Sequence, residues 1–408
     1  MTSTSKNVFH PFISALSAFF TKEEQNILLE LLKGTIILPS SSFNAIWKDG
    51  EPEMALRTFY SKIHQILEKF GRYQWEILRK IQKFRRFRMI SRGILIVDEH
   101  VISVRSQKIQ GTGKLFCPAE KKKVNGFQII SLHYQYGRFD YPVGLMLYYQ
   151  RQYFEKNEEF GQFKTKNQLT YELLRSIFQF SNCPQTICMD RGFCDKKIYD
   201  LCNRYHKTFV NCLKRNWTVT VRKSKYSVEQ LGKSLQDSDF ALYTIRNRKT
   251  GNLYRYYAAE VVVYVPKLKQ MKIVYSYCAV RDSNGNYQLD RRENLAFFLT
   301  NDLSASISRV LTDYKVRWAI ETGYRELNQH LGLNHSFLRT TSERSYFIIF
   351  LFLASMALVW VHTRYRKYSH DWSLGNMKKH VFFLFFHNIS LVIQSDWVNL
   401  TVFSNDVV

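Results

Sequence analysis

The chain has 408 residues and is strongly basic, with 59 lysines and arginines against 34 aspartates and glutamates and a formal net charge of +25. A hydrophobic content of 45% excludes an intrinsically disordered protein, and the length predicts two or three domains with a large core. The charge is compatible with a nucleic-acid partner, whose phosphates would attract it, and also with a membrane surface.

Neither the cysteines nor the amino terminus indicates an exported protein. The seven cysteines contain no CxxC zinc pair and no thioredoxin motif, so we expect most of them to be core residues in a reducing cytosol. Residues 1–6 lack the charged and apolar regions of a secretory signal. The sequence therefore predicts a cytoplasmic protein.

Residues 1–88 are predicted to form a small helical domain that binds DNA. Thr21 to Glu24 has the pattern of a capping box ahead of a periodic apolar stretch, and a second helical pattern runs from Met54 to Phe70. The segment 79–88 then interleaves six basic residues with two phenylalanines. This segment fits a surface that grips phosphates and fits equally a solvated basic helix anchored by its aromatic residues.

Residues 89–215 have the pattern of a mixed α/β core that carries two acids. The apolar run Ile94 to Val97 predicts a buried strand with Asp98 at its end. A strand over 186–189, a glycine turn and a helix place Asp190 at the carboxyl edge of a sheet, where ligands of open α/β sheets bind. Glu99 is excluded because successive strand residues point to opposite faces. The other predicted elements are strands over 127–136, 141–149 and 209–213 and helices over 169–180 and 194–206, which give the order β-β-β-α-β-α-β.

The next region, 216–298, reads as a β-rich insertion. Its strand-like runs are 240–246, 253–265 and 272–281, and turns are predicted at 249–252 and 282–286.

The stretch that begins at Asp313 places an aromatic residue, a cation and a carboxylate at helical spacing. At about 100° per residue, one face of the predicted helix is apolar and can rest on a core, while the other can hold a metal beside a polyanion. The polar face carries Tyr314, Arg317, Glu321, Arg325 and Asn328, and the apolar stripe carries Val316, Ile320, Gly323, Leu327 and Leu331. Asp302, upstream, is expected in a loop or a cap.

Two apolar stretches follow. The run Tyr346 to Val361 is compatible with a membrane helix, but it is shorter than the about 20 residues that a bilayer needs, so a buried core helix is favoured. A second cluster, Val381 to Phe386 and Leu391 to Ile393, predicts packing or dimerisation.

The chain resembles the DDE transposases of bacterial insertion sequences, in particular the cut-and-paste class with a Tyr-x2-Arg-x3-Glu-x6-Lys signature. Asp98, Asp190 and Glu321 match its three acids, and the intervals of 92 and 131 residues between them suit that class. Tyr314 and Arg317 also match the signature, but Asn328 stands where the lysine belongs. The resemblance spans roughly residues 90 to 365.

The resemblance implies a fold and a metal. The expected fold is a ribonuclease-H-like mixed sheet flanked by helices, an α/β class, interrupted by the β-rich insertion and preceded by the helical domain. The implied segments are 1–88, 89–215, 216–298, 299–365 with the second part of the core, and 366–408. Asp98, Asp190 and Glu321 would bind two Mg²⁺ ions, with Mn²⁺ able to substitute, for in-line phosphoryl transfer.

The resemblance also implies partners. These are double-stranded DNA, as terminal inverted repeats and as target, and a second copy of the chain in a homodimer, on the nucleoid and without a membrane. Arg317 would contact phosphates at the transposon end, with Tyr314 near the hairpin end. The other expected DNA contacts are Arg191, Lys214, Arg215, Arg325 and Asn328, and further candidates are Trp217, Arg222 and Lys223.

Other interpretations remain open. Taken singly, Asp98 or Asp190 could cap a helix, and Glu321 could pair with Arg317. Their order and intervals together favour a transposase that nicks, forms and reopens a hairpin, and inserts the element. Because Asn328 is neutral, a DNA-end-binding protein with impaired catalysis is one alternative. A metal-dependent nuclease of the same fold and a basic membrane protein are the others.

Overall fold

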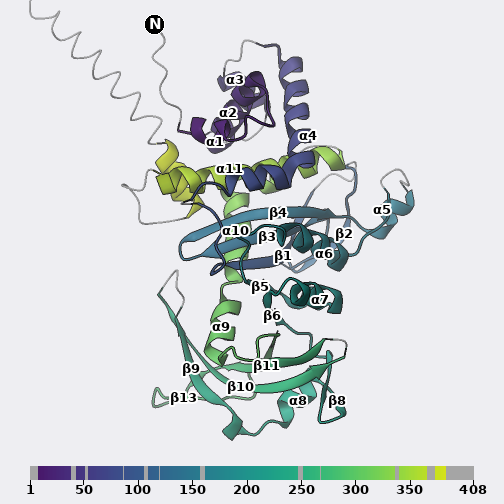
Figure 1. The fold of residues 1–408 in the computed structure, drawn as a ribbon, viewed down its shortest axis with the longest axis vertical. Helices are drawn as coiled ribbons and strands as arrows, with labels where there is room; N and C mark the ends of the chain where they lie inside the picture. Colours follow the sequence, from purple (N-terminus) through teal and green to yellow (C-terminus); the bar gives the residue numbers. More distant parts are fainter. Residues whose placement is uncertain are drawn as a thin grey trace, which may run out of the picture. The chain divides into compact units, whose positions relative to one another are not determined.

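The computed structural model describes residues 8–37, 43–50, 54–85, 87–104, 109–118, 120–156, 161–246, 251–266, 268–335, 340–364 and 373–382. The chain forms two compact units, one made of Met1–Arg88 with Tyr324–Val408 and the other of Met89–Gly323. Figure 1 shows the helices and strands, with labels where there is room.

The unit of residues 89–323 is built on a 12-stranded sheet with the order β2-β3-β1-β5-β6-β14-β11-β10-β7-β8, to which β4 is added beside β3 and β9 beside β10. The first strands are β1 (Ile94–Ser103), β2 (Gly113–Cys117), β3 (Lys122–Tyr136), β4 (Phe139–Tyr148), β5 (Thr186–Met189) and β6 (Thr208–Cys212). The later ones are β7 (Thr218–Val221), β8 (Ser224–Ser227), β9 (Ala241–Arg246), β10 (Leu253–Val265), β11 (Lys269–Cys278) and β14 (Ala296–Thr300), with a separate small hairpin of β12 (Val280–Arg281) and β13 (Tyr287–Gln288).

Helices flank the parallel centre of this sheet. Strand β5 pairs in parallel with both β1 and β6, while β3 runs antiparallel to β1. One face is covered by α6 (Lys166–Ile177) and α7 (Lys196–Arg204), and α9 (Ile307–Lys315) lies on the other (Figure 1). The remaining helical segments are α5 (Arg151–Lys156), α8 (Val228–Ser234), α10 (Trp318–Leu331), η2 (Arg191–Phe193) and η3 (Asp237–Asp239). The predicted mixed sheet flanked by helices is confirmed.

Two local predictions about the acids' surroundings are wrong. Asp98 does not end its strand, because β1 continues to Ser103 along β3 after its parallel pairing with β5 stops at Val97. The predicted helix from Asp313 is interrupted: α9 ends at Lys315, α10 begins at Trp318, and the turn between them is held by a bond from the Arg317 N–H to the Tyr314 carbonyl. Strand β2 and helix α5 were not predicted.

The β-rich insertion is present and continuous with the core sheet. The predicted strands correspond to β9, β10 and β11, and the structure adds β7, β8 and α8. Strand β11 pairs with β14, which in turn pairs with β6. The insertion therefore extends the sheet that carries the acids. Asp302, as expected, lies in a turn before α9, where its carboxylate accepts from the Ser304 and Ala305 N–H groups.

The unit of residues 1–88 and 324–408 is helical among its described residues. Its helices are α1 (His10–Ser14), α2 (Lys22–Ile37), α3 (Phe43–Gly50), α4 (Leu56–Ile81) and α11 (Thr341–Arg364), with the short η4 (Leu333–His335) and a further helix over 374–382. The predicted capping box is formed, since Thr21 N–H donates to Glu24 at 2.8 Å and Glu24 N–H donates to Thr21 Oγ1 at 3.2 Å.

Helix α11 is the core of this unit. It is 24 residues long, so the predicted length was too short, and within the described part of the chain it alone is long and apolar enough to cross a membrane. However, 89% of its most apolar stretch is buried, against neighbours that include α4 and α2. This burial supports the predicted core helix. The apolar cluster that begins at Val381 lies outside the described residues beyond Phe382.

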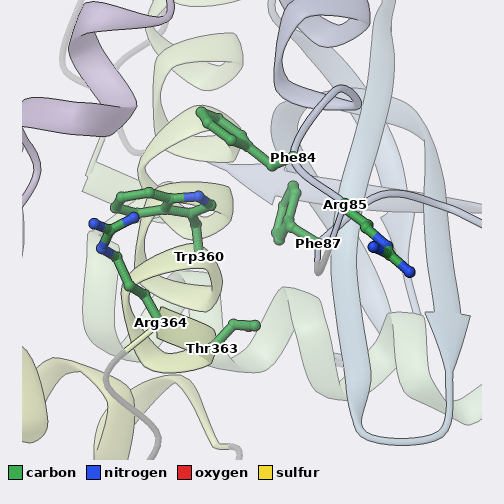
Figure 2. Close-up of a pocket in the computed structure, with 6 residues that line it drawn as sticks. All are labelled: Phe84, Arg85, Phe87, Trp360, Thr363 and Arg364. Carbon is green, nitrogen blue, oxygen red and sulfur yellow. The ribbon is translucent and has the colours of Figure 1, made fainter.

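The basic segment after α4 is a series of turns and not a continued helix. Its two phenylalanines are anchors: Phe84 packs on Trp360 with ring centroids 5.4 Å apart, and Phe87 is 1% exposed. Figure 2 shows these rings with Thr363 and Arg364 around a pocket of about 230 Å³, with the Arg85 side chain directed away from Trp360. The predicted packing of the aromatics is thus observed.

Candidate active site

Asp98 lies on a buried part of β1. Its neighbours Leu95 to Val97 are fully buried, and Asp98 itself is 7% exposed. One carboxylate oxygen accepts from the Glu99 N–H at 2.8 Å, and the other accepts from Arg317 Nη1 at 2.7 Å. Glu99 pairs instead with Lys166 of α6 at 2.7 Å, which agrees with its predicted exclusion from the Asp98 face.

Asp190 directly follows β5 and precedes the short helix η2. Its carboxylate accepts a hydrogen bond of 3.1 Å from the Tyr314 hydroxyl. The turn at Asp190 is held by the buried Asn211 of β6. The Asn211 amide donates to the carbonyls of Met189 at 3.0 Å and Asp190 at 2.8 Å. The adjacent strand therefore fixes the backbone that presents Asp190.

Glu321 lies in the first turn of α10. Its carboxylate accepts from Arg317 Nη2 at 2.6 Å, so the guanidinium of Arg317 bridges Glu321 and Asp98. Their side chains differ in exposure, at 10% for Asp98 and 37% for Glu321. The three predicted acids thus converge on the junction between α9 and α10, where Tyr314 and Arg317 contact all of them.

The electrostatics of this cluster favour a bound cation. The pKa of Asp98 is raised to about 7: burial is the largest cause, the charges of Asp190 and Glu321 add to it, and Arg317 and the Glu99 N–H oppose it. Burial alone would lower the pKa of Arg317, but Asp98 and the other neighbouring groups raise it above its ordinary value. Burial also raises the pKa of Tyr314, so its hydroxyl remains a donor to Asp190.

Tyr314 is fixed by packing as well as by its hydroxyl. Its ring lies 4.4 Å from that of Phe298 on β14, centroid to centroid. The Arg317 guanidinium lies 5.7 Å from the centroid of the same ring. Strand β14 thereby packs against the α9–α10 junction through the Phe298 side chain.

The residue types at this site fit Mg²⁺, although their present arrangement is an ion-pair network. Three carboxylates supply the hard oxygen donors that Mg²⁺ prefers, and the buried Asp98 already has a cation beside it. In the described ranges no group of three or more histidine, cysteine or acidic side chains is arranged to hold a metal ion. In this structure the Arg317 guanidinium supplies the positive charge beside Asp98 and Glu321.

The other predicted contacts are more dispersed. Arg191, next to Asp190, is exposed, and so are Lys214 and Arg215 after β6. Arg222 and Lys223 form the tight turn between β7 and β8, both with positive φ. Trp217 is half-buried and packs edge-on against Tyr199. Arg325 is exposed and Asn328 is half-buried, on the part of α10 that belongs to the other unit.

Comparison with known families identifies the class of protein to which this mixed sheet belongs. The sequence profile described as "Transposase DDE domain" matches residues 90–357, more than half of the chain. The chain therefore belongs to this family of DDE transposase domains, whose catalytic fold is ribonuclease-H-like.

Two further comparisons add no argument. A comparison with curated proteins finds no match. Among solved structures, the NurA nuclease from Sulfolobus solfataricus aligns at 9% identity over 64% of this chain and 86% of that chain, with a TM-score of 0.24. A likeness at this level shows neither a common fold nor a common function.

The structure brings residues to the site that sequence reasoning missed. Asn211 was seen only as part of a strand, and its role depends on the turn that follows the neighbouring strand. His133 was placed in the apolar strand 127–136 without a role. A histidine inside such a run was the available signal, but its partner Asp140 could be identified only from the hairpin pairing.

Proposed function

We propose that this chain is a DDE transposase that binds terminal inverted repeats and carries out the DNA cleavage and strand transfer of cut-and-paste transposition. The family match supports transposase function in general. The observation that supports the finer proposal is the convergence of Asp98, Asp190 and Glu321, from three separate elements, on Tyr314 and Arg317.

In this proposal the three acids are the catalytic residues and hold the divalent metal. Asp98, from the sheet, would hold the metal together with Asp190 and Glu321. Bound Mg²⁺, or Mn²⁺ in its place, would supply activation of the attacking oxygen and stabilisation of the leaving oxygen. All three donors are carboxylates, as this chemistry requires.

The chain's own residues orient these acids and the DNA. The Tyr314 hydroxyl holds one oxygen of Asp190, and Asn211 holds its backbone, so this carboxylate keeps one orientation. Arg317 presents a planar guanidinium whose two terminal nitrogens already bind oxygens at 2.6 and 2.7 Å. The same fork matches the oxygens of a phosphate, to which we assign it when DNA is bound.

DNA binding is proposed for the exposed basic residues around the acids and in the helical unit. Arg191, Lys214 and Arg215 are exposed beside the ends of β5 and β6. In the other unit, Arg85 and Arg88 project from the segment whose phenylalanines are anchored, so the aromatics fix the backbone that carries the cations. Arg325 and Asn328 are assigned as further contacts.

The partners follow from the same proposal. The net charge of +25 favours a duplex on which counterions are released. Two transposon ends require two active sites to be brought together, so we assign a homodimer on DNA in the cytoplasm, associated with the nucleoid. Target DNA would be the second nucleic-acid substrate.

A cleavage assay tests this proposal. A labelled duplex that carries the inverted repeats flanking the gene is incubated with Mg²⁺ and the wild-type chain, Asp98→Asn or Asp190→Asn. We expect nicked, hairpin and joined products from the wild type and loss of cleavage in both variants, with end binding retained. Cleavage without joined product would identify a nuclease, and binding without cleavage in every form would identify a chain with impaired catalysis. Cleavage that both variants retain at the wild-type level would reject the assignment of these acids.

A further inference from the structure

Helix α10 and strand β3 approach closely at one point, where Gly323 lies against the ring of His133. A Cβ atom added at Gly323 would lie 3.1 Å from His133 Nε2 and 3.2 Å from Nδ1, and closer still to the carbon between them. These separations are tighter than ordinary packing contacts. Only a residue without a side chain allows the helix to sit at this distance.

The ring of His133 is held by burial and by a polar partner. It is 1% exposed, and its Nδ1 lies 3.0 Å from a carboxylate oxygen of Asp140 on β4. The β3–β4 pairing shifts register between Leu132 and His133, an irregularity of the kind that re-aims a side chain in a sheet. The short turn at Gly137, which has a φ of +58°, returns the chain so that Asp140 reaches the histidine.

This contact is placed close to two of the proposed catalytic acids. In the pairing of β1 with β3, His133 lies opposite Ile96 and Ser131 lies opposite Asp98, so the contact is two residues along the strand from Asp98 and on the same face. Gly323 is two residues from Glu321 along α10. Helix α10 therefore contacts the sheet, at Gly323 and His133, within one helical turn of Glu321.

We propose that Asp140, His133 and Gly323 form a positioning device that sets the distance between the Glu321 and Asp98 carboxylates. The inference rests on the proposed function of these acids. Asp140 holds the His133 ring, the ring limits the approach of α10, and Gly323 permits that approach. His133 and Asp140 act through α10 and are positioning residues without contact to DNA.

The assignment has a specific consequence for metal use. Mg²⁺ demands nearly ideal octahedral geometry and tolerates a displaced ligand poorly, and a displacement of about 1 Å can lower an enzymatic rate by about 100-fold. Gly323→Ala should push α10 away from β3 and weaken the Mg²⁺ site. In the double variant Gly323→Ala/His133→Ala, removal of the ring should make room for the new methyl group and restore part of the lost Mg²⁺ affinity.

The experiment uses the full chain and four proteins: wild type, Gly323→Ala, the double variant, and Thr322→Ala as a control on the same helix. The first readout is Mn²⁺ and Mg²⁺ binding by calorimetry without DNA, and the second is end cleavage over a range of Mg²⁺ concentrations. Thermal unfolding and end binding verify that each variant is folded.

We expect Gly323→Ala to bind metal at least about tenfold more weakly and to need more Mg²⁺ for cleavage, with partial rescue by Mn²⁺ and in the double variant. Thr322→Ala should match the wild type. Wild-type metal binding in Gly323→Ala, or a loss that the double variant does not relieve, would overturn the inference. If the wild type binds metal but cleaves nothing, the proposed function fails, while the calorimetry still decides the positioning role.

Discussion

The guanidinium of Arg317 lies 2.7 Å from the carboxylate of Asp98, and both side chains are largely buried. A second nitrogen of the same guanidinium reaches Glu321 at 2.6 Å. A single cation therefore pairs with two of the acids proposed to bind metal. Since the same positive charge would be supplied by a divalent ion, we expect Arg317 and the metal to compete for these carboxylates, and Arg317 to be released toward DNA when metal binds.

Replacement of Arg317 tests this competition. Arg317→Gln leaves the buried Asp98 without its cation, which should lower the metal-free stability by about 3 kcal/mol. A divalent ion can replace the lost charge, so Mg²⁺ or Mn²⁺ should raise the melting temperature of the variant more than that of the wild type. Thermal unfolding with and without metal measures both effects. An equal metal-induced shift in the two proteins would argue against competition.

The Tyr314 hydroxyl should matter for catalysis and little for folding. Tyr314→Phe keeps the ring on Phe298 but removes the hydrogen bond to Asp190. We expect end binding to be unchanged and the cleavage rate to fall about tenfold, the equivalent of roughly 1.4 kcal/mol. Tyr256 on β10 packs against the same core cluster, so Tyr256→Phe is the matched control. A wild-type cleavage rate in Tyr314→Phe would show that the Tyr314 hydroxyl has no role in catalysis.

Much of the site could be predicted from sequence because its acids sit next to strong local patterns. Asp98 adjoins a buried apolar strand, Asp190 follows a strand before a glycine turn, and Glu321 has helical spacing from Arg317. The interruption of the helix between Lys315 and Trp318 could not be predicted, since the helical spacing of the side chains continues across it. The orientation of Arg317 toward the acids likewise depends on tertiary contacts.

The fold shows the same division between local and non-local information. Alternating strands and the capping box at Thr21 were recognisable from short-range patterns. The extent of β1 was not, because its last residues pair with β3 alone after β5 has ended. The role of His133 required a register shift between β3 and β4 that no local pattern reports.

The capping box should make the helical unit sensitive to acid. Burial by itself would raise the pKa of Glu24, but hydrogen bonds from Lys69 and Thr21 bring it below its usual value of 4.5. A lowered pKa in the folded state means that the stabilisation is present at neutral pH and is lost as the pH falls below 4.5 through the folded pKa.

Glu24→Gln should therefore lower stability by about 1 to 2 kcal/mol at neutral pH, and its difference from wild type should shrink below about pH 4. Glu30→Gln, which removes a more exposed pair with Lys33, is the control and should change little. Melting temperatures across this pH range give the answer. A difference that stays constant with pH would contradict the assignment.

Asn328 is the departure from the family signature and invites restoration of the lysine. Asn328→Lys adds one cation, so end binding should tighten and the plot of log affinity against log salt should steepen by about 0.9. Gln329→Lys, an exposed neighbour on α10, controls for charge alone. Equal effects of the two substitutions would show that position 328 has no special place on the DNA.

The most direct test of the central claim is Mg²⁺-dependent cleavage of a labelled duplex carrying the flanking inverted repeat, with Glu321→Gln compared with wild type and with Glu99→Gln. Glu99 pairs with Lys166 on α6 and serves as the matched acid outside the site. We predict cleavage by the wild type and by Glu99→Gln, and no cleavage by Glu321→Gln despite unchanged end binding. Undiminished cleavage by Glu321→Gln would contradict the proposed three-acid site.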